Sequence, residues 1–249
     1  GNAASTSQSN NTVTLNDTTA PAITGTTVAS NNASIAVTFS EAVYNTSGGS
    51  GALEASDFTL TLSGGTATLS SATPSSISSS SNTYTLGLSL SGTPNGSETI
   101  TVVPSSSTAI YDAAGNAAST SQSNNTVTLN DKTAPTLSSV SIASNNSTST
   151  LAAVGDNVTL TFTASETIST PVVTFLSGGA AITDTSVTYV NTSGNTWTAV
   201  YTTESNDTTG SVAYSIAFSD SAGSAGTAVT SGGGSVTFDK TAPTVSSVS

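Results

Sequence analysis

Cysteine, methionine, histidine and arginine are absent from this chain of 249 residues, and its only lysines are Lys132 and Lys240. Without histidine or cysteine, the chain has neither the imidazole base nor the thiolate nucleophile of most catalytic sites. It also lacks the nitrogen and sulfur ligands that zinc, copper and iron prefer. We therefore expect no hydrolytic or redox activity, and the metals that remain are hard cations, which bind oxygen.

Positive charge is scarce, with a formal net charge of -12 and an isoelectric point near 4.1. Phosphate backbones and anionic lipids repel such a chain, so we expect no nucleic-acid partner. No apolar run approaches the roughly 20 residues of a membrane span, so we expect no direct membrane span. The sequence has no initiator methionine and no basic start before an apolar segment. We therefore expect Gly1 to lie inside a longer polypeptide.

The abundant residues are those of strands and turns. Serine, threonine and glycine dominate, and valine, isoleucine and threonine recur in alternating runs. Ile35, Val37 and Phe39 should face one way, because successive side chains of a strand point to opposite faces. Hydrophobic residues make up 35% of the chain, enough for small, thin cores. The sequence predicts an all-β protein, and no stretch indicates a helix.

A repeat divides the chain. The segment GNAASTSQSNNTVTLND at 1–17 recurs unchanged at 115–131, and DKTAPTLSSVS at 131–141 returns as DKTAPTVSSVS at 239–249. These copies predict the last strand of a preceding module, two complete modules and the start of a following module. Their bounds are 1–17, 18–131 (module 1), 132–239 (module 2) and 240–249.

Each module has the length and turn spacing of an immunoglobulin-like β-sandwich, for which we predict seven strands. In module 1 the predicted strands are 22–28, 34–39, 57–62, 66–70, 83–90, 98–103 and 125–130. In module 2 they are 136–142, 157–163, 171–176, 182–190, 196–203, 211–218 and 234–238. The serine-rich run from Ser75 to Ser81 is interpreted as a turn.

The aromatic residues within alternating strands are expected to lie in the cores. They include Tyr84, Trp197, Tyr201 and Phe218.

Several phrases of the sequence resemble a known family. FSEAVYNTSGGSG, ASDFTLTLSGG, YDAAGNAAS and NDKTAPT are similar to the bacterial Ig-like repeats of long secreted adhesins and extracellular surface filaments. The resemblance covers both modules and implies tandem sandwiches that serve as a spacer or fibre shaft, often with calcium at the joints. Module 2 departs from the pattern, with FSDSAGSAG where module 1 has YDAAGN, so the resemblance leaves its loop chemistry open.

Three acidic positions recur in both modules. One lies at the joint, one after the second strand and one after the sixth strand, and a sandwich of this topology brings these positions to the same pole. They are Asp17, Glu41 and Asp112 in module 1, and Asp131, Glu166 and Asp220 in module 2. Three carboxylates with no cation beside them repel one another unless they are protonated or share a cation. Calcium fits, because it takes six to eight oxygen ligands.

Two further residues belong to the predicted calcium sites. Asn116 and backbone carbonyls would complete the shell in module 1, and Asp239 begins a third joint. The alternative is that the aspartates only form turns. Glu54 and Asp57 are interpreted as capping a turn, and Asp156 as a turn residue.

Two functions compete. The leading hypothesis is a repetitive shaft of an extracellular filament or giant adhesin, with neighbouring modules and identical chains as partners. The alternative is a carbohydrate- or surface-binding adhesin module, for which Tyr44 and Tyr111 are the loop aromatics, although both are expected to close the sandwich. A strand predicted at 10–16 would either complete its own module or pair with another chain by β-augmentation.

Overall fold

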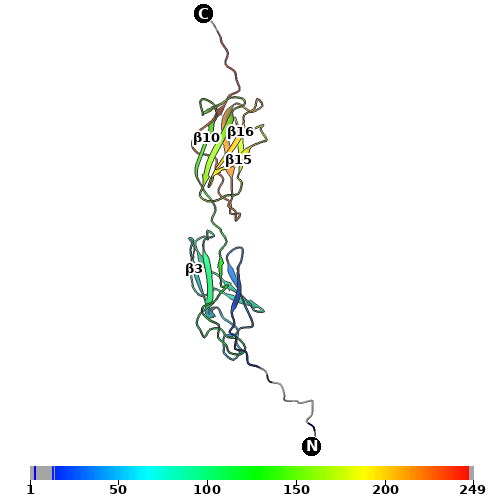
Figure 1. Ribbon diagram of the computed structural model, residues 1–249. Helices are drawn as coiled ribbons and strands as arrows, with labels where there is room; N and C mark the ends of the chain where they lie inside the picture. The colour runs from blue at the N-terminus through cyan, green and yellow to red at the C-terminus, as the bar shows by residue number, and fades with distance from the viewer. Residues whose placement is uncertain (1–2, 4–12, 14, 247–249) are drawn as a thin grey trace. The chain divides into compact units, whose positions relative to one another are not determined.

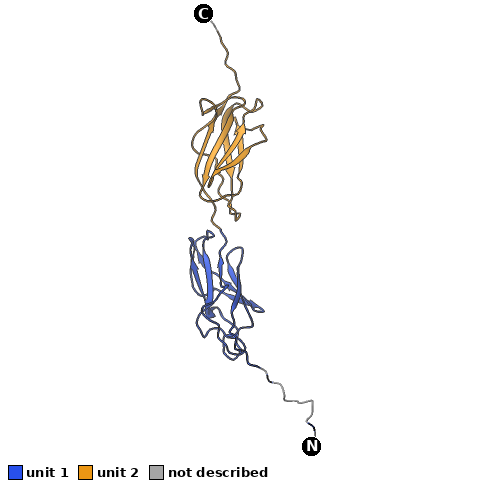
Figure 2. Cartoon of the chain, in the orientation of Figure 1, with its two compact units in different colours: residues 1–131 blue, residues 132–249 orange. Residues whose placement is uncertain are grey.

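The computed structural model describes residues 3, 13 and 15–246 (Figure 1). The chain divides into two compact units, Gly1–Asp131 (unit 1) and Lys132–Ser249 (unit 2) (Figure 2). Among the described residues the only helix is the single turn η1, Ala55–Asp57, which is far too short to cross a membrane. The strand predicted at 10–16 falls largely outside the described residues.

Unit 1 contains two main sheets of antiparallel strands. The first has the order β1 (Ile23–Val28), β2 (Ser34–Phe39), β6 (Thr83–Gly87), β5 (Ile77–Ser80). The second has the order β3 (Phe58–Ser63), β8 (Thr99–Pro104), β9 (Thr126–Thr128). A two-residue pair, β4 (Thr68–Leu69) with β7 (Leu90–Ser91), accompanies them.

Unit 2 repeats this arrangement. Its first sheet has the order β10 (Leu137–Ser144), β12 (Asn157–Ala164), β16 (Thr196–Thr202), β15 (Thr188–Ser193). Its second sheet has the order β11 (Leu151–Ala152), β18 (Thr237–Phe238), β17 (Gly210–Ala217), β13 (Val172–Ser177), β14 (Ala180–Ala181).

The strand orders confirm the predicted fold class. If the seven main strands of either unit are lettered A to G along the chain, one sheet reads A-B-E-D and the other C-F-G. This is the strand order of a constant-type immunoglobulin sandwich. Both units are therefore immunoglobulin-like β-sandwiches.

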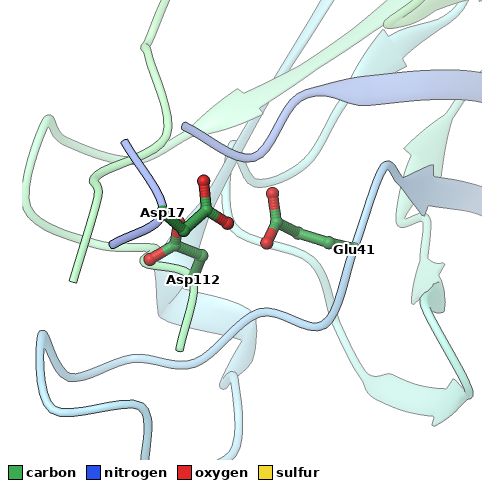
Figure 3. Close-up of side chains that lie close together, drawn as sticks. All are labelled: Asp17, Glu41 and Asp112. Atoms are coloured by element: carbon green, nitrogen blue, oxygen red, sulfur yellow. The ribbon is translucent and has the colours of Figure 1, made fainter. Parts of the chain in front are cut away.

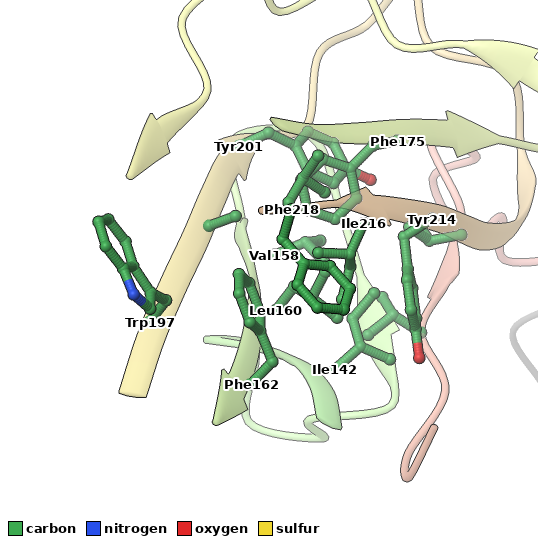
Figure 4. Close-up of a cluster of buried hydrophobic side chains, with 14 of the residues drawn as sticks. Ile142, Val158, Leu160, Phe162, Phe175, Trp197, Tyr201, Tyr214, Ile216 and Phe218 are labelled. Atoms are coloured by element: carbon green, nitrogen blue, oxygen red, sulfur yellow. The ribbon is translucent and has the colours of Figure 1, made fainter. Parts of the chain in front are cut away.

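One core fills each sandwich. In unit 1, Ile35, Val37 and Phe39 of β2 are buried, as alternation predicts, and the ring centroids of Phe39 and Phe58 from the opposite sheet lie 6.3 Å apart. In unit 2, the buried cluster includes Phe162 and Phe175 (Figure 4).

The predictions for individual core and turn residues are also confirmed. Four aromatic side chains predicted to lie in the cores are buried, namely Tyr84, Trp197, Tyr201 and Phe218. The turn residues behave as predicted: Asp57 accepts a hydrogen bond from the Glu54 N–H at 2.7 Å, and Asp156 from the Ala153 N–H at 2.7 Å.

The prediction of a turn from Ser75 to Ser81 is wrong for most of this serine-rich run. Ile77–Ser80 is the edge strand β5, and the turn that follows begins at Ser81, whose φ is 55°. Serine has little intrinsic preference for strands, but the backbone of β6 supplies hydrogen-bonding partners, and Ile77 packs against the core. Tertiary pairing therefore overrides the local preference for a turn.

Other strands differ in extent or were missed. β15 begins at Thr188 and not at 182, because Thr183 and Asp184 form polar contacts: Thr183 N–H donates to Asp207, and Asp184 accepts from Ser186 N–H. The short strands β7, β11 and β14 have only two residues each, too few for a recognisable alternation. Among the described residues, each unit consequently has nine strands in place of the seven predicted.

Candidate metal centres

Three carboxylates meet at one pole of unit 1. We call Asp17, Glu41 and Asp112 cluster 1; each offers a carboxylate oxygen, and these oxygens all lie within 4.8 Å of one another. Figure 3 shows the three side chains directed toward a common space. Asp17 is exposed, Glu41 is half-buried and Asp112 is buried. The exposure of the three side chains therefore decreases from Asp17 to Asp112.

Each residue of cluster 1 comes from a different segment. Asp17 precedes β1, Glu41 follows β2, and Asp112 follows β8. Ser40 N–H donates to the Ala22 carbonyl at 2.8 Å, which holds the segment before Glu41 beside the start of β1. Tyr44 and Tyr111 pair through their backbones, with N–H to O distances of 2.7 and 2.8 Å. These bonds bring the loops of Glu41 and Asp112 together.

The loop 112–116 presents the Asp112 carboxylate. Its Oδ1 accepts from the Asn116 backbone N–H at 2.8 Å, and its Oδ2 accepts from Asn116 Nδ2 at 2.7 Å. The same Nδ2 also donates to the Asp17 carbonyl at 3.2 Å. Gly115 has a φ of 95°, and a Cβ there would lie 2.8 Å from the Ser47 carbonyl oxygen, so the loop requires glycine.

The pKa of the Glu41 carboxyl group in cluster 1 is raised. Burial raises the pKa of Glu41, and the charges of Asp112 and Asp17 raise it further. Burial also acts to raise the pKa of Asp112, but hydrogen bonds from Asn116 and the loop backbone outweigh it and hold that pKa below its ordinary value. Unit 1 contains no lysine or arginine that could neutralise the cluster.

Cluster 2 is the equivalent set, Asp131, Glu166 and Asp220, whose carboxylate oxygens also all lie within 4.8 Å of one another. Asp131 immediately precedes unit 2, Glu166 follows β12, and Asp220 follows β17. Ser165 N–H donates to the Thr136 carbonyl at 2.8 Å, as Ser40 does to Ala22. The sets that the repeat predicted are thus brought together twice.

The loop 220–224 keeps the conformation of loop 112–116 despite its different sequence. Asp220 N–H donates to the Ser224 carbonyl at 3.0 Å, Gly223 N–H to the Asp220 carbonyl at 3.4 Å, and Ser224 N–H to Asp220 Oδ1 at 2.7 Å. The bonds of loop 112–116 are the same, at 3.1, 3.3 and 2.8 Å. The backbone of this loop, which the resemblance left open, is therefore the same in both units.

One atom of cluster 2 has no partner. Asp220 is only 2% exposed, and its Oδ2 is buried without a hydrogen bond. A buried carboxylate oxygen without a partner is costly, and native structures normally satisfy such atoms with a donor, an ion or water. The Oδ2 atom of Asp220 thus points to a ligand within cluster 2.

The other two predicted ligands, Asn116 and Asp239, do not present a side-chain oxygen to either cluster in this structure. Asn116 lies at cluster 1, but it presents its amide nitrogen to Asp112, so its oxygen would have to be turned inward to bind a cation. Asp239 accepts from Thr241 N–H at 2.8 Å and belongs to neither carboxylate cluster of the described residues.

Sequence reasoning missed two buried acidic residues, Asp207 in unit 2 and Glu98 in unit 1. Glu98 has no exposed surface, and it accepts hydrogen bonds from the backbone N–H groups of Thr66, Ala67 and Asn95 at 2.7, 3.0 and 3.0 Å. Burial acts to raise the pKa of Glu98, but these bonds outweigh it and lower the pKa. Glu98 therefore ties the loop at 66–67 to the start of β8, and no local pattern marks it.

The loop aromatics do not form a binding platform. Tyr44 and Tyr111 are half-buried and paired through their backbones, which confirms that they close the sandwich. A carbohydrate-stacking site would need exposed aromatic faces.

No protein-family model and no curated protein matches this chain. Among solved structures, it is similar to titin domains in complex with telethonin, at 15% identity over 92% of this chain and 100% of that chain, with a TM-score of 0.26. It is also similar to a tandem of titin Ig domains, at 12% identity over 89% of this chain and 97% of that one, with a TM-score of 0.26. The assignment of the fold rests on the strand order within each unit.

Proposed function

We propose that this chain is a segment of the repetitive shaft of an extracellular filament or giant adhesin, with a structural and non-catalytic role, and that its joints bind calcium. The observation that carries the proposal is the recurrence of one carboxylate cluster at the same pole of two consecutive sandwiches. Turn formation alone requires neither Glu41 nor Glu166. A shared cation gives all three positions of each set a common purpose.

Calcium suits the chemistry of both clusters. The donors are carboxylate oxygens, which hard cations prefer, and backbone carbonyls or water can complete a shell of six to eight ligands. Burial raises the pKa of Glu41 and the charges of Asp112 and Asp17 add to it; a divalent cation would offset those charges, and at cluster 2 it would give Asp220 Oδ2 a partner. Magnesium fits less well, because it demands near-ideal octahedral geometry and keeps several waters.

The position of the clusters supports a role in a shaft. Each contains an aspartate that precedes the first strand of a sandwich, and the next residues include Pro21 or Pro135. A cation that binds this aspartate together with two loops restricts the chain where it enters the unit, and proline restricts it further. We therefore expect calcium to stiffen the joint between neighbouring modules of the same chain.

The proposal implies an extracellular or cell-surface setting. Extracellular calcium modules bind calcium with dissociation constants of about 10⁻⁴ to 10⁻³ M. Affinity depends on the number of charged ligands, so sites with three carboxylates suit this weak range. Identical chains in a filament are the proposed partners beyond the modules of one chain.

Calcium titration of the full chain tests this function. Calorimetry should show binding at two sites at or below millimolar calcium, and small-angle scattering should show a narrower distribution of conformations with calcium than with chelator. No binding at millimolar calcium, together with identical scattering profiles, would leave the acidic residues as turn formers.

Glu41→Gln should change the stability of unit 1 in opposite directions with and without calcium. The folded pKa of Glu41 lies above its unfolded value, so the folded state binds more protons between the two values. The stability of unit 1 therefore falls as pH rises through that interval. In chelator at neutral pH, the variant should raise the thermal midpoint of unit 1, because the repulsion is gone; in saturating calcium it should lower it.

Glu54→Gln is the charge-matched control, since Glu54 is exposed in the same unit and lies outside cluster 1. It should leave the calcium dependence unchanged. If Glu41→Gln shifts the midpoint in the same direction in both buffers, Glu41 does not bind the cation.

A further inference from the structure

The aspartate loops of the two clusters differ at two positions: Ala113 is replaced by Ser221, and Asn116 by Ser224. Loops 112–116 and 220–224 share their backbone hydrogen bonds, and each has a glycine in the left-handed region, with φ of 95° at Gly115 and 89° at Gly223. The fifth residue is Asn116 in one loop and Ser224 in the other. The backbone N–H of each donates to Oδ1 of its loop aspartate, at 2.8 and 2.7 Å. Ala113 and Ser221 are exposed, whereas the fifth residues are half-buried and contact the loop aspartate.

That difference decides the state of the second carboxylate oxygen. Asn116 Nδ2 donates to Asp112 Oδ2 at 2.7 Å, so both oxygens of this carboxylate are occupied by donors from its own loop. The corresponding Oδ2 of Asp220 is buried and has no partner. Asn116 thus holds the place where a cation would bind, whereas the loop of Ser224 leaves that place open.

We propose that the fifth loop residue sets the calcium affinity of each joint, so that cluster 2 binds calcium at lower concentration than cluster 1. This inference rests on the proposed calcium function. At cluster 1 the cation competes with the Asn116 amide for Asp112 Oδ2, whereas at cluster 2 Asp220 Oδ2 has no competing donor. Because hydrogen bonds to charged groups are among the stronger ones, the dissociation constants should differ roughly tenfold or more.

The consequence is a graded response to calcium. At concentrations between the two dissociation constants, cluster 2 is loaded and cluster 1 is empty. Joints of the Ser224 type would therefore stay stiff when joints of the Asn116 type have already loosened.

Single-site variants of the full chain measure each cluster separately. Asp220→Asn removes one charge from cluster 2 and leaves cluster 1 to be titrated with calcium by calorimetry; Asp112→Asn does the reverse. Both substitutions keep an acceptor for the loop N–H at Oδ1. The calcium dissociation constant in Asp220→Asn should exceed that in Asp112→Asn roughly tenfold or more.

Exchanging the fifth loop residues tests directly whether they set the calcium affinity. Asn116→Ser on the Asp220→Asn background should lower the dissociation constant of cluster 1, and Ser224→Asn on the Asp112→Asn background should raise that of cluster 2. Thermal unfolding in chelator checks that each variant is folded. If Asn116→Ser destabilises unit 1, Ser224→Asn in unit 2 still carries the test.

The possible outcomes are distinct. If the exchange has the opposite sign, the asparagine turns its oxygen toward the cation and is a ligand, and the inference is wrong while the calcium function stands. Equal affinities that the exchange does not alter also refute the inference alone. Absence of calcium binding in the unsubstituted chain refutes the proposed function and the inference together.

Discussion

Phe162→Ala is expected to lower the free energy of unfolding of unit 2 by about 3–5 kcal/mol and to leave unit 1 unchanged. Phe162 is fully buried in the central strand β12 (Figure 4). It pairs with Val140 of β10 on one side and with Trp197 of β16 on the other. Removing the ring loses its transfer free energy and leaves a cavity that the rigid sheets fill only in part. A sandwich with a small core has little stability in reserve, so this loss is large for the unit.

Phe39→Ala is the matched substitution in unit 1, because Phe39 lies in the equivalent central strand β2 and is 2% exposed. Differential scanning calorimetry of the full chain should resolve two transitions, and each substitution should move only one of them. If either substitution lowers both transitions equally, the two sandwiches unfold as one cooperative body. Independent unfolding of the units is the behaviour expected of a repetitive shaft, in which damage to one module spares the next.

Calcium is expected to raise the unfolding free energy of each unit by roughly 2.7 kcal/mol at about 100 times its dissociation constant. Binding to the folded form alone produces this gain by mass action, and for domains of this size it corresponds to a rise of roughly 10 °C in the thermal midpoint. Asp220→Asn should abolish most of the gain in unit 2, because it neutralises the buried ligand of cluster 2. The gain in unit 1 should persist.

Asp131→Asn tests the contribution of the joint itself. It should weaken the calcium gain of unit 2 more than that of unit 1, since Asp131 belongs to cluster 2 and Asp17 takes its place in cluster 1. Thermal unfolding with calcium and with chelator measures both effects. For Asp220→Asn, a calcium-dependent gain in the stability of unit 2 equal to that of the unsubstituted chain would show that the stabilising calcium binds elsewhere.

Local sequence patterns predicted much of the fold. Alternation along β2 identified which side chains of Ile35, Val37 and Phe39 face the core, because the period of a strand depends only on backbone geometry. The unchanged repeat at 1–17 and 115–131 located the joints. Together with the connections of an immunoglobulin-like sandwich, these patterns are sufficient to group the six carboxylates into two sets.

Other features follow from pairing partners and burial that no local pattern records. The serines of β5 form a strand because the β6 backbone lies beside them, which reversed the prediction of a turn. Glu98 is buried because N–H groups from a loop about 30 residues earlier converge on it. In both cases the free energy that decides the conformation comes from contacts distant in sequence.

The sequence by itself determined the fold class, the repeat and the membership of the two carboxylate clusters, since each follows from periodicity, self-similarity and the connections between strands. Only the tertiary structure decided how the clusters differ. Whether Asn116 donates to Asp112 Oδ2, and whether Asp220 Oδ2 is left without a donor, depends on atomic positions to within the length of a hydrogen bond. The sequence shows that the fifth loop residues are Asn116 and Ser224, but packing sets which atoms their side chains contact.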